Sequence, residues 1–158
     1  MINTFSTDGN LSKLDRKNFQ KQVEGKNTDL YILRNQNGME VAVTNFGCAL
    51  LSIMVPDKNG KYANVLLGHD SIDHVINSPE PFLSTVIGRY GNRIAKGKFT
   101  LDEEVYSLAI NNGSNALHGG PEGFHRVVWT AEEAKGGDVA SLKLKYVAKD
   151  GEQGYPGN

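Results

Sequence analysis

Short apolar runs separated by turn-forming residues fill the chain from Leu30 onward, and this pattern constrains the fold more than any other feature. Between residues 39 and 44, Met, Val and Val alternate with Glu, Ala and Thr, which is the period of a strand with one buried apolar face. The segments 35–38 and 56–60 are rich in turn formers. No helical pattern of ten or more residues occurs beyond residue 27. The sequence therefore predicts an all-β fold, a sandwich or barrel.

The same pattern places individual strands and separates a polar segment at the amino terminus. We expect strands at residues 31–33, 39–44, 49–55, 65–67, 98–101, 105–108, 127–131 and 141–147. Strands 98–101 and 105–108 are expected to form a hairpin, although its tip lacks the glycine that tight turns prefer. Residues 1–27 are polar, and we expect a tail or strap that contains a short helical turn within residues 12–20.

Length, charge and cysteine content exclude several classes of function. The chain has 158 residues and a net charge of −1, and its basic residues are interleaved with acids, which argues against a nucleic-acid partner. No run of about 18 apolar residues is present, so no membrane-spanning segment is predicted. The amino terminus lacks the features of a secretory signal, which favours a cytoplasmic protein; export with a presequence already removed stays open. The single Cys48 lies in an apolar run and is expected to be a buried, inert thiol.

Polar residues suited to binding gather in Gly88–Phe99, with the sequence GRYGNRIAKGKF. Asn92 offers both a donor and an acceptor, and Arg93 presents a planar fork of donors, a combination suited to adjacent hydroxyl groups of a sugar. Neighbouring glycines leave room for a ligand. The alternative is that Arg93 pairs with a carboxylate and the glycines only form turns. For Arg89 we expect a structural salt bridge.

Histidine residues add one candidate to this cluster. His118 precedes two glycines, so its imidazole can stand at a pocket wall and exchange hydrogen bonds near neutral pH; a structural role is the alternative. His69 and His74 lie near two aspartates, but their spacing matches no zinc pattern, and a solvated loop is expected there. His125 lacks comparable surroundings. No metal site is predicted.

No catalytic acid–base pair is predicted within the chain. The acidic residues 102–104 fall on a hairpin tip, and Glu132 and Glu133 follow a strand, so both groups are expected to be solvated. Ser84 and Ser114 lack the context of a nucleophile, and no glycine-rich phosphate loop with a lysine is present. The residues therefore predict binding without catalytic residues in this chain.

These motifs together resemble the aldose 1-epimerase, or galactose mutarotase, family. The resemblance rests on GRYGNRI, LHGG, a GF pair before a tryptophan, and the terminal DGEQGYPGN. The upstream stretch NGMEVAVTNFGCALLSIMVPDKNGKYANVLLGHD is similar to the same family. The resemblance covers residues 28–158, and its motifs are specific in combination.

The resemblance implies a large antiparallel β-sandwich, of which residues 28–158 form the amino-terminal portion, incomplete in this chain. It also implies interconversion of the α and β anomers of free hexoses such as galactose and glucose, with no cofactor and no metal. In the family, a glutamate base takes the anomeric hydroxyl proton and a histidine acid protonates the ring oxygen. The family's sugar contacts map onto Asn92, Arg93 and His118 as substrate-binding residues.

The family's acid histidine and base glutamate do not map onto this sequence, because relatives carry them in strands beyond the PGN turn. We therefore expect a sugar-binding, amino-terminal part of an aldose 1-epimerase, inactive alone and completed by a carboxy-terminal segment or a second chain. Two alternatives stay open: a non-catalytic carbohydrate-binding module, or a fragment with neither activity. Free sugars are expected rather than sugar phosphates, since no basic cluster for a phosphate is evident.

Overall fold

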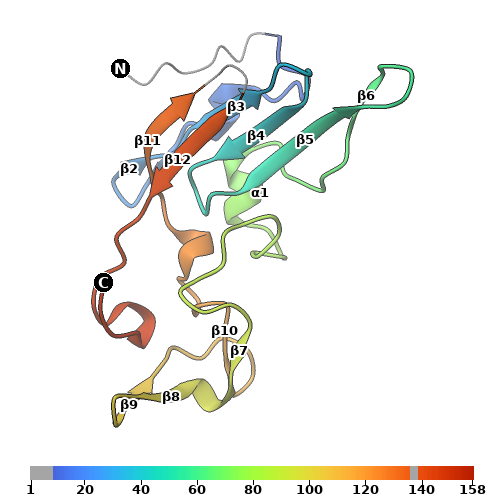
Figure 1. Cartoon of the computed structure of the whole chain (residues 1–158). Coiled ribbons are helices and arrows are strands. Elements are labelled where there is room, and N and C mark those ends of the chain that lie inside the picture. The colour runs from blue at the N-terminus through green and yellow to red at the C-terminus, as the bar shows by residue number, and fades with distance from the viewer. Residues whose placement is uncertain (1–8, 136–138) are drawn as a thin grey trace.

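The computed structural model describes residues 9–135 and 139–158 (Figure 1). Its strands are β1 (Gln22–Val23), β2 (Lys26–Asn27), β3 (Leu30–Arg34), β4 (Glu40–Thr44), β5 (Leu50–Pro56), β6 (Tyr62–Asn64), β7 (Arg93–Ile94), β8 (Lys98–Leu101), β9 (Glu104–Ser107), β10 (Ala116–Leu117), β11 (Thr130–Lys135) and β12 (Ser141–Lys145). Its helical segments are η1 (Arg16–Phe19), α1 (Ile72–Ile76), η2 (Ala95–Gly97), η3 (Phe124–Arg126) and η4 (Glu152–Gly154). Within the described ranges, no helix has the length and apolar character needed to cross a membrane.

A four-stranded antiparallel sheet dominates the upper part of the molecule in Figure 1. Its strand order is β3-β4-β5-β6. The remaining strands form antiparallel pairs, which are β1 with β2, β7 with β10, β8 with β9, and β11 with β12. All of these sheets are antiparallel, which confirms the predicted all-β class.

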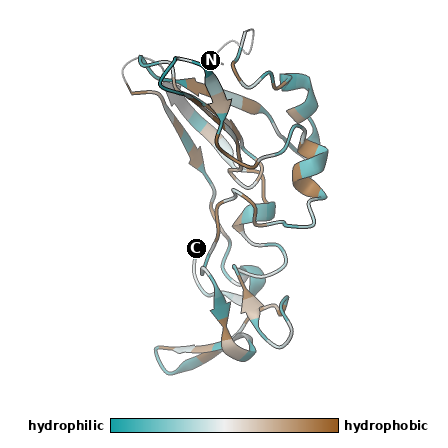
Figure 2. Ribbon diagram, turned by 90° about the vertical axis from the view of Figure 1, so that its right-hand side faces the viewer, coloured by the Kyte–Doolittle hydropathy of each residue, from teal (hydrophilic) through white to brown (hydrophobic). Residues whose placement is uncertain are grey.

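The main core lies between the four-stranded sheet and the short helices on one side of it, as Figure 2 shows. Ile32 of β3 and Ala42 of β4 are paired in register, so they project from the same face. Phe19 of η1 and Ile72 of α1 pack into the same cluster. Phe19 is 0% exposed, so part of the polar amino-terminal segment is anchored in the core.

Strand β4 departs from the predicted burial pattern. The positions expected to face solvent are the most deeply buried ones, namely Glu40, Ala42 and Thr44, each 0% exposed. A carboxylate tolerates this environment because Arg34 Nη2 donates to Glu40 at 2.5 Å. The backbone N–H groups of Leu11 and Ser12 donate to the two oxygens of Glu40 at 2.9 and 3.0 Å. A buried charge therefore ties the amino-terminal segment to the sheet.

The predicted strand at residues 65–67 is wrong, because β6 ends at Asn64. The side-chain Oδ1 of Asn64 accepts hydrogen bonds from Ile53 N–H at 3.0 Å and Leu66 N–H at 3.1 Å. A side chain thus occupies the place of a backbone partner and interrupts the ladder. Val65 N–H still donates to Ile53 O at 3.0 Å, so the chain continues alongside β5 without strand geometry.

Two other predicted strand regions are present in the structure, but their first or last residues differ from the predicted ones. The hairpin of β8 and β9 is confirmed, and Asp102 and Glu103 adopt φ values of 48° and 69° at its tip. These values fit a two-residue turn that normally favours Asn and Gly, so the missing glycine does not prevent the hairpin. Strand β11 begins at Thr130 rather than at residue 127, and Val128 instead forms an isolated bridge with Phe46.

The lower part of the molecule holds the polar motifs and has its own small core. Leu108, Ala116 and Tyr155 are buried together, and Ile94 and Phe99 pack against them. This cluster joins the β7–β10 pair, the β8–β9 hairpin and the turn after η4. It positions one wall of the candidate site.

Candidate functional site

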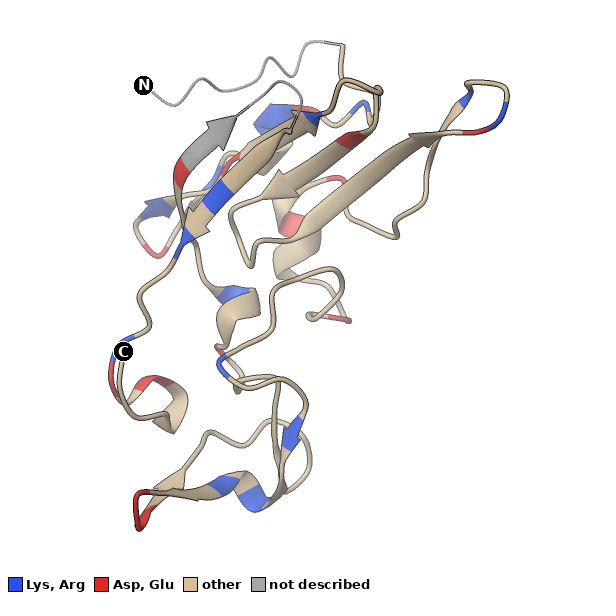
Figure 3. Ribbon diagram, in the orientation of Figure 1, with Lys and Arg blue, Asp and Glu red and all other residues tan. Residues whose placement is uncertain are grey.

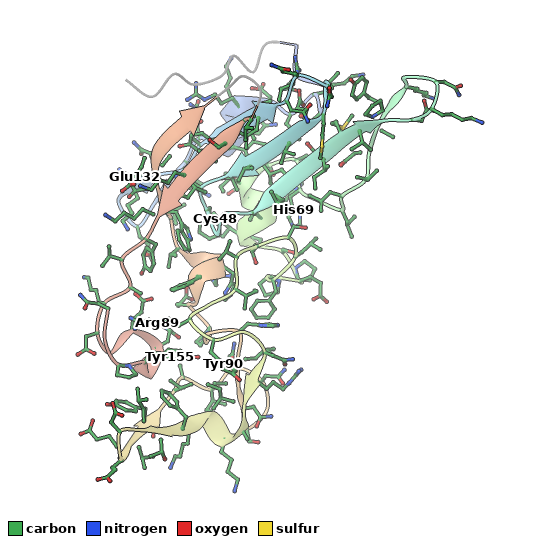
Figure 4. The ribbon with its side chains drawn as sticks, in the orientation of Figure 1. Cys48, His69, Arg89, Tyr90, Glu132 and Tyr155 are labelled. Atoms are coloured by element: carbon green, nitrogen blue, oxygen red, sulfur yellow. The ribbon has the colours of Figure 1, made fainter. Side chains whose placement is uncertain are left out.

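A cleft of about 460 Å³ opens beside β7 in the lower part of the molecule. It is lined by Arg89, Tyr90, Arg93, Ile94, Phe99 and Tyr155. Figure 4 shows Arg89, Tyr90 and Tyr155 close together where the turn after η4 meets the segment before β7. The predicted contact Arg93 therefore belongs to a real concavity whose other walls are mainly aromatic and apolar.

Asn92 and His118 are held together by a reciprocal pair of hydrogen bonds. The backbone N–H of Asn92 donates to His118 Nδ1 at 2.9 Å, and the backbone N–H of His118 donates to Asn92 O at 3.0 Å. The pairing of β7 with β10, in which Leu117 lies opposite Arg93, sets this geometry. Because a backbone N–H can only donate, Nδ1 must be unprotonated, and the neutral imidazole carries its proton on Nε2. His118 is thereby prepared as a donor through Nε2.

Arg93 contacts amide oxygens instead of a carboxylate. Its Nε donates to Asn112 Oδ1 at 2.9 Å, and its Nη1 donates to Asn92 Oδ1 at 3.3 Å. No ion pair to Arg93 occurs within residues 9–135 and 139–158, so the carboxylate-pairing alternative is wrong for this part of the chain. The guanidinium is held in place while its side chain stays exposed. The three predicted site residues thus lie in one hydrogen-bonded group.

The predicted salt bridge of Arg89 is also wrong. Its guanidinium donates instead to three backbone carbonyls, with Nη1 at 3.1 Å from Pro156 O and 2.5 Å from Gly157 O, and Nη2 at 2.5 Å from Lys149 O. These carbonyls belong to the turn that carries Tyr155. Arg89 therefore joins two walls of the cleft that lie more than 60 residues apart in sequence.

The Phe82 ring packs against His118 edge to face and also contacts His125. The Phe82 ring lies 4.7 Å from His118 and 4.6 Å from His125, measured between ring centroids. His125 is 2% exposed, and its Nδ1 has no hydrogen-bond partner among the residues that the structure describes. Burial, with smaller contributions from Arg126 and His118, lowers the pKa of His125 to about 4. His125 was not predictable as part of this group, because its neighbours in sequence give no sign of a contact with the distant Phe82.

The remaining titratable candidates lie away from this cleft. His74 Nδ1 contacts Asp70 Oδ1 at 2.6 Å, and both side chains are exposed as predicted, but His74 lies in α1 and not in a loop. In the described part of the chain, no three His, Cys, Asp or Glu side chains are grouped so that they could hold a metal ion. Glu132 lies within β11 and not after a strand as predicted; it pairs with Lys143, which holds the pKa of that exposed carboxyl below its usual value. Burial raises the pKa of Cys48 to about 12, so its thiol is not a nucleophile at neutral pH.

The chemistry of the cleft is that of a binding surface. Arg93 supplies donors to the cleft, and Tyr90, Phe99 and Tyr155 supply aromatic surface. Asn92 and His118 are not among the described lining residues; they lie beside the cleft, where Asn92 is bonded to both Arg93 and His118. None of the described residues that line the cleft is a carboxylate or a histidine placed to exchange protons with a ligand inside it. The arrangement suits a neutral polyhydroxylated ligand, whose hydroxyl groups need donors and acceptors and whose C–H surface packs on aromatic rings.

Comparison with known proteins gives one consistent family. The family model described as aldose 1-epimerase matches residues 29–158. Galactose mutarotase of Bos taurus is 42% identical over 119 residues, which cover 75% of this chain and 33% of that relative. Aldose 1-epimerase of Escherichia coli K12 is 38% identical over 135 residues, which cover 85% of this chain and 38% of that relative. The chain thus spans about a third of the length of these curated relatives.

Solved structures agree with the sequence comparisons. A GalM/aldose epimerase homologue from C. elegans matches with a TM-score of 0.75 and 29% identity, covering 82% of this chain and 39% of that one. Galactose 1-epimerase from Lactobacillus acidophilus NCFM matches with a TM-score of 0.74 and 28% identity, covering 87% of this chain and 40% of that one. The similarity confirms the predicted mutarotase-like antiparallel fold over the matched length.

Proposed function

This chain belongs to the aldose 1-epimerase family, and from that premise we propose that it supplies the sugar-binding wall of an enzyme that interconverts the α and β anomers of free hexoses such as galactose and glucose. The single observation that carries the proposal is the hydrogen-bonded group of Asn92, Arg93 and His118 beside an aromatic cleft. Each of the three brings polar atoms that a sugar hydroxyl can use, and their mutual bonds hold them in place before a ligand arrives.

The charge of the cleft supports a neutral sugar over a sugar phosphate. Two arginines line it, but the Nη atoms of Arg89 already donate to the carbonyls of Lys149, Pro156 and Gly157. Arg93 is then the one arginine in the described cleft lining that keeps N–H donors available for a ligand. A phosphate is normally bound by several charged donors or by backbone N–H groups at a helix start, whereas the cleft offers only the guanidinium of Arg93 among its described lining residues.

We assign the proton-transfer groups to polypeptide beyond the residues of this chain. Anomer exchange needs a base that takes the proton from the anomeric hydroxyl and an acid that gives a proton to the ring oxygen as the C1–O5 bond breaks. The open aldehyde then rotates about C1–C2 and closes with the two proton transfers reversed. The described cleft lining contains no such pair. In this proposal the chain binds and orients the sugar, and a complementing segment or second chain supplies acid and base.

The absence of an acid–base pair from the described cleft lining also favours a second candidate, a non-catalytic carbohydrate-binding module that uses the same three residues. The two candidates differ in what a complementing polypeptide does. An enzyme part gains turnover when completed, whereas a binding module keeps its affinity and gains nothing.

Galactose binding and mutarotation test the proposal together. We expect galactose to perturb the amide signals of residues 88–93 and 115–120 in an NMR titration of this chain, while polarimetry of fresh α-galactose shows the spontaneous rate. Co-expression with the part of Bos taurus galactose mutarotase that this chain does not match should accelerate mutarotation. Affinity without acceleration in that complex would favour the binding module instead.

A matched pair of arginine variants tests the assigned residues in the same titration. Arg93→Lys keeps the charge but loses the fork, and we expect the galactose Kd to rise roughly tenfold, the value of one good hydrogen bond. Arg126→Lys changes an arginine outside the cleft lining and should leave the Kd unchanged. Equal affinities for Arg93→Lys and the unsubstituted chain would remove Arg93 from the site.

A further inference from the structure

An exposed apolar segment follows β6 directly. Val65 is 65% exposed and Leu67 is 75% exposed, although both residues lie alongside a central part of the sheet. Val65 N–H donates to Ile53 O of β5, and Gly68 packs so closely on Leu51 O that a Cβ there would lie 2.0 Å from it. The segment 65–68 therefore runs beside β5 as an irregular continuation of β6.

The outer edge of this continuation is open. In the part of the chain that the structure describes, β6 pairs with β5 and with no other strand. Among the backbone groups of residues 66 and 67, Leu66 N–H is taken by Asn64 Oδ1 and Leu67 O accepts from Ser84 Oγ at 3.3 Å. The side chains of Asn64 and Ser84 hold the segment in place, while the apolar side chains of Val65 and Leu67 stay exposed.

The sequence of this edge lacks charged residues and proline, two of the devices that protect a free edge. Natural edge strands are blunted by charged residues, proline or bulges, since an uncharged open edge invites pairing with another chain. Residues 62–68, YANVLLG, contain no Asp, Glu, Lys, Arg or Pro. Figure 3 shows charges at the tip of the β5–β6 hairpin and none along the segment that follows it. A covered edge needs no such protection, so the composition indicates that this one is covered.

We propose that residues 64–68 are the docking edge for the polypeptide that completes the aldose 1-epimerase domain, which adds a strand beside them and covers Val65 and Leu67. The occupant follows from the proposed function, on which this inference rests, and from length. The solved relatives share this fold over 39% and 40% of their chains, so most of their polypeptide lies outside the matched region and is available to cover the edge. Val65 and Leu67 are exposed while Leu66 between them is half-buried, so the segment presents two apolar side chains that added polypeptide can cover.

Paired lysine substitutions separate this edge from other exposed apolar positions. In the Val65→Lys/Leu67→Lys variant, circular dichroism of the chain alone should be unchanged, because both side chains already face solvent. Co-purification with the unmatched part of Bos taurus galactose mutarotase should fall roughly tenfold or more, since two buried apolar contacts are replaced by charges. Val139→Lys is the control, because Val139 is 78% exposed and lies outside the edge. Hydrogen exchange at residues 65–67 should slow in the complex formed by the unsubstituted chain.

The possible outcomes distinguish this inference from the proposed function. If the double variant co-purifies like the unsubstituted chain and mutarotation is restored, the docking edge is wrong and the function stands. If the complex forms through this edge without any mutarotation, the edge stands and the enzymatic function fails. If the unsubstituted chain binds no complementing polypeptide, both fail. A dimer of this chain alone that the double variant dissociates would make a second copy the occupant and overturn the proposal.

Discussion

At the residue scale, the candidate site depends on side chains whose hydrogen-bonding state is fixed by their neighbours. His118 is neutral with its proton on Nε2 while its Nδ1 accepts from Asn92 N–H, so its donor direction is set before a ligand binds. Phe82 separates it from the buried His125. A cation at position 125 would have no partner for its Nδ1, so the stack requires neutral His125.

The burial of His125 predicts a specific dependence of stability on pH. Its folded pKa is lowered to about 4, mainly by burial, whereas an unfolded histidine titrates near about 6.5. As the pH falls below 6.5, the unfolded chain takes up a proton that native His125 does not accept. The free energy of unfolding therefore decreases by about 3 kcal/mol until the pH reaches the folded pKa, where the loss is complete. Urea denaturation at several pH values between 7.5 and 4 measures this decrease in the free energy of unfolding.

A glutamine variant assigns this pH dependence to His125. His125→Gln removes the titrating group, so most of the decrease between pH 6.5 and 4 should disappear, whatever the stability at pH 7.5. His74→Gln, at an exposed histidine, should keep the decrease. A His125→Gln profile parallel to that of the unsubstituted chain would assign the effect to another group.

At the scale of elements, a strand was predictable where its alternating apolar residues and the strand it pairs with lie within one short stretch of the chain. The β8–β9 hairpin and β3 to β5 follow from alternation and turn residues. The buried face of β4 was not predictable from its own residues. Glu40 can be buried because Arg34 and the backbone N–H groups of residues 11 and 12 donate hydrogen bonds to its carboxylate, and the sequence near β4 does not indicate these donors. The strand expected at 65–67 failed for a second reason, since the Asn64 side chain ends the ladder there.

The contacts of Glu40 predict that replacing its carboxylate by an amide weakens the attachment of the amino-terminal segment to the sheet. Burial opposes ionisation of Glu40, but hydrogen bonds from Leu11 N–H, Arg34 and Ser12 N–H together hold its pKa below the usual value. Glu40→Gln removes the charge that Arg34 needs, and we expect about 3 kcal/mol of destabilisation. Faster hydrogen exchange at Leu11 and Ser12 should accompany it.

The matched control is Glu80→Gln, at an exposed position, which should change neither stability nor exchange. The lowered pKa of Glu40 also gives the sign of its pH effect. Its contribution is present above the unfolded pKa of about 4.3 and is lost as the pH falls through the folded value. Unaltered exchange at residues 11 and 12 in Glu40→Gln would show that other contacts, such as the packing of Leu14 and Phe19 in the core, hold the segment.

At the scale of the whole molecule, the cleft is assembled from segments that are remote in sequence. Asn92, Arg93 and His118 could be predicted because their motifs resemble a family in which those positions contact a sugar. The position of Tyr155 beside Arg93 and the carbonyls held by Arg89 could not, since the docking of the turn at 149–157 on the segment before β7 is a tertiary arrangement. Residue types alone made a salt bridge the expected role of Arg89, whereas the folded chain offers it carbonyls.

Arg89 is therefore expected to control the cleft without contacting the ligand through its Nη atoms. Arg89→Met removes three donor–carbonyl contacts, each worth about 1–3 kcal/mol when the donor is charged, while keeping much of the apolar side chain. Hydrogen exchange across residues 149–157 should accelerate, and the galactose Kd should rise because Tyr155 is no longer held against Phe99. Arg126→Met, an arginine outside the cleft lining, should leave both unchanged. Unchanged exchange in Arg89→Met would mean that the Tyr155 cluster, with Leu108 and Ala116, holds the turn without help from the guanidinium.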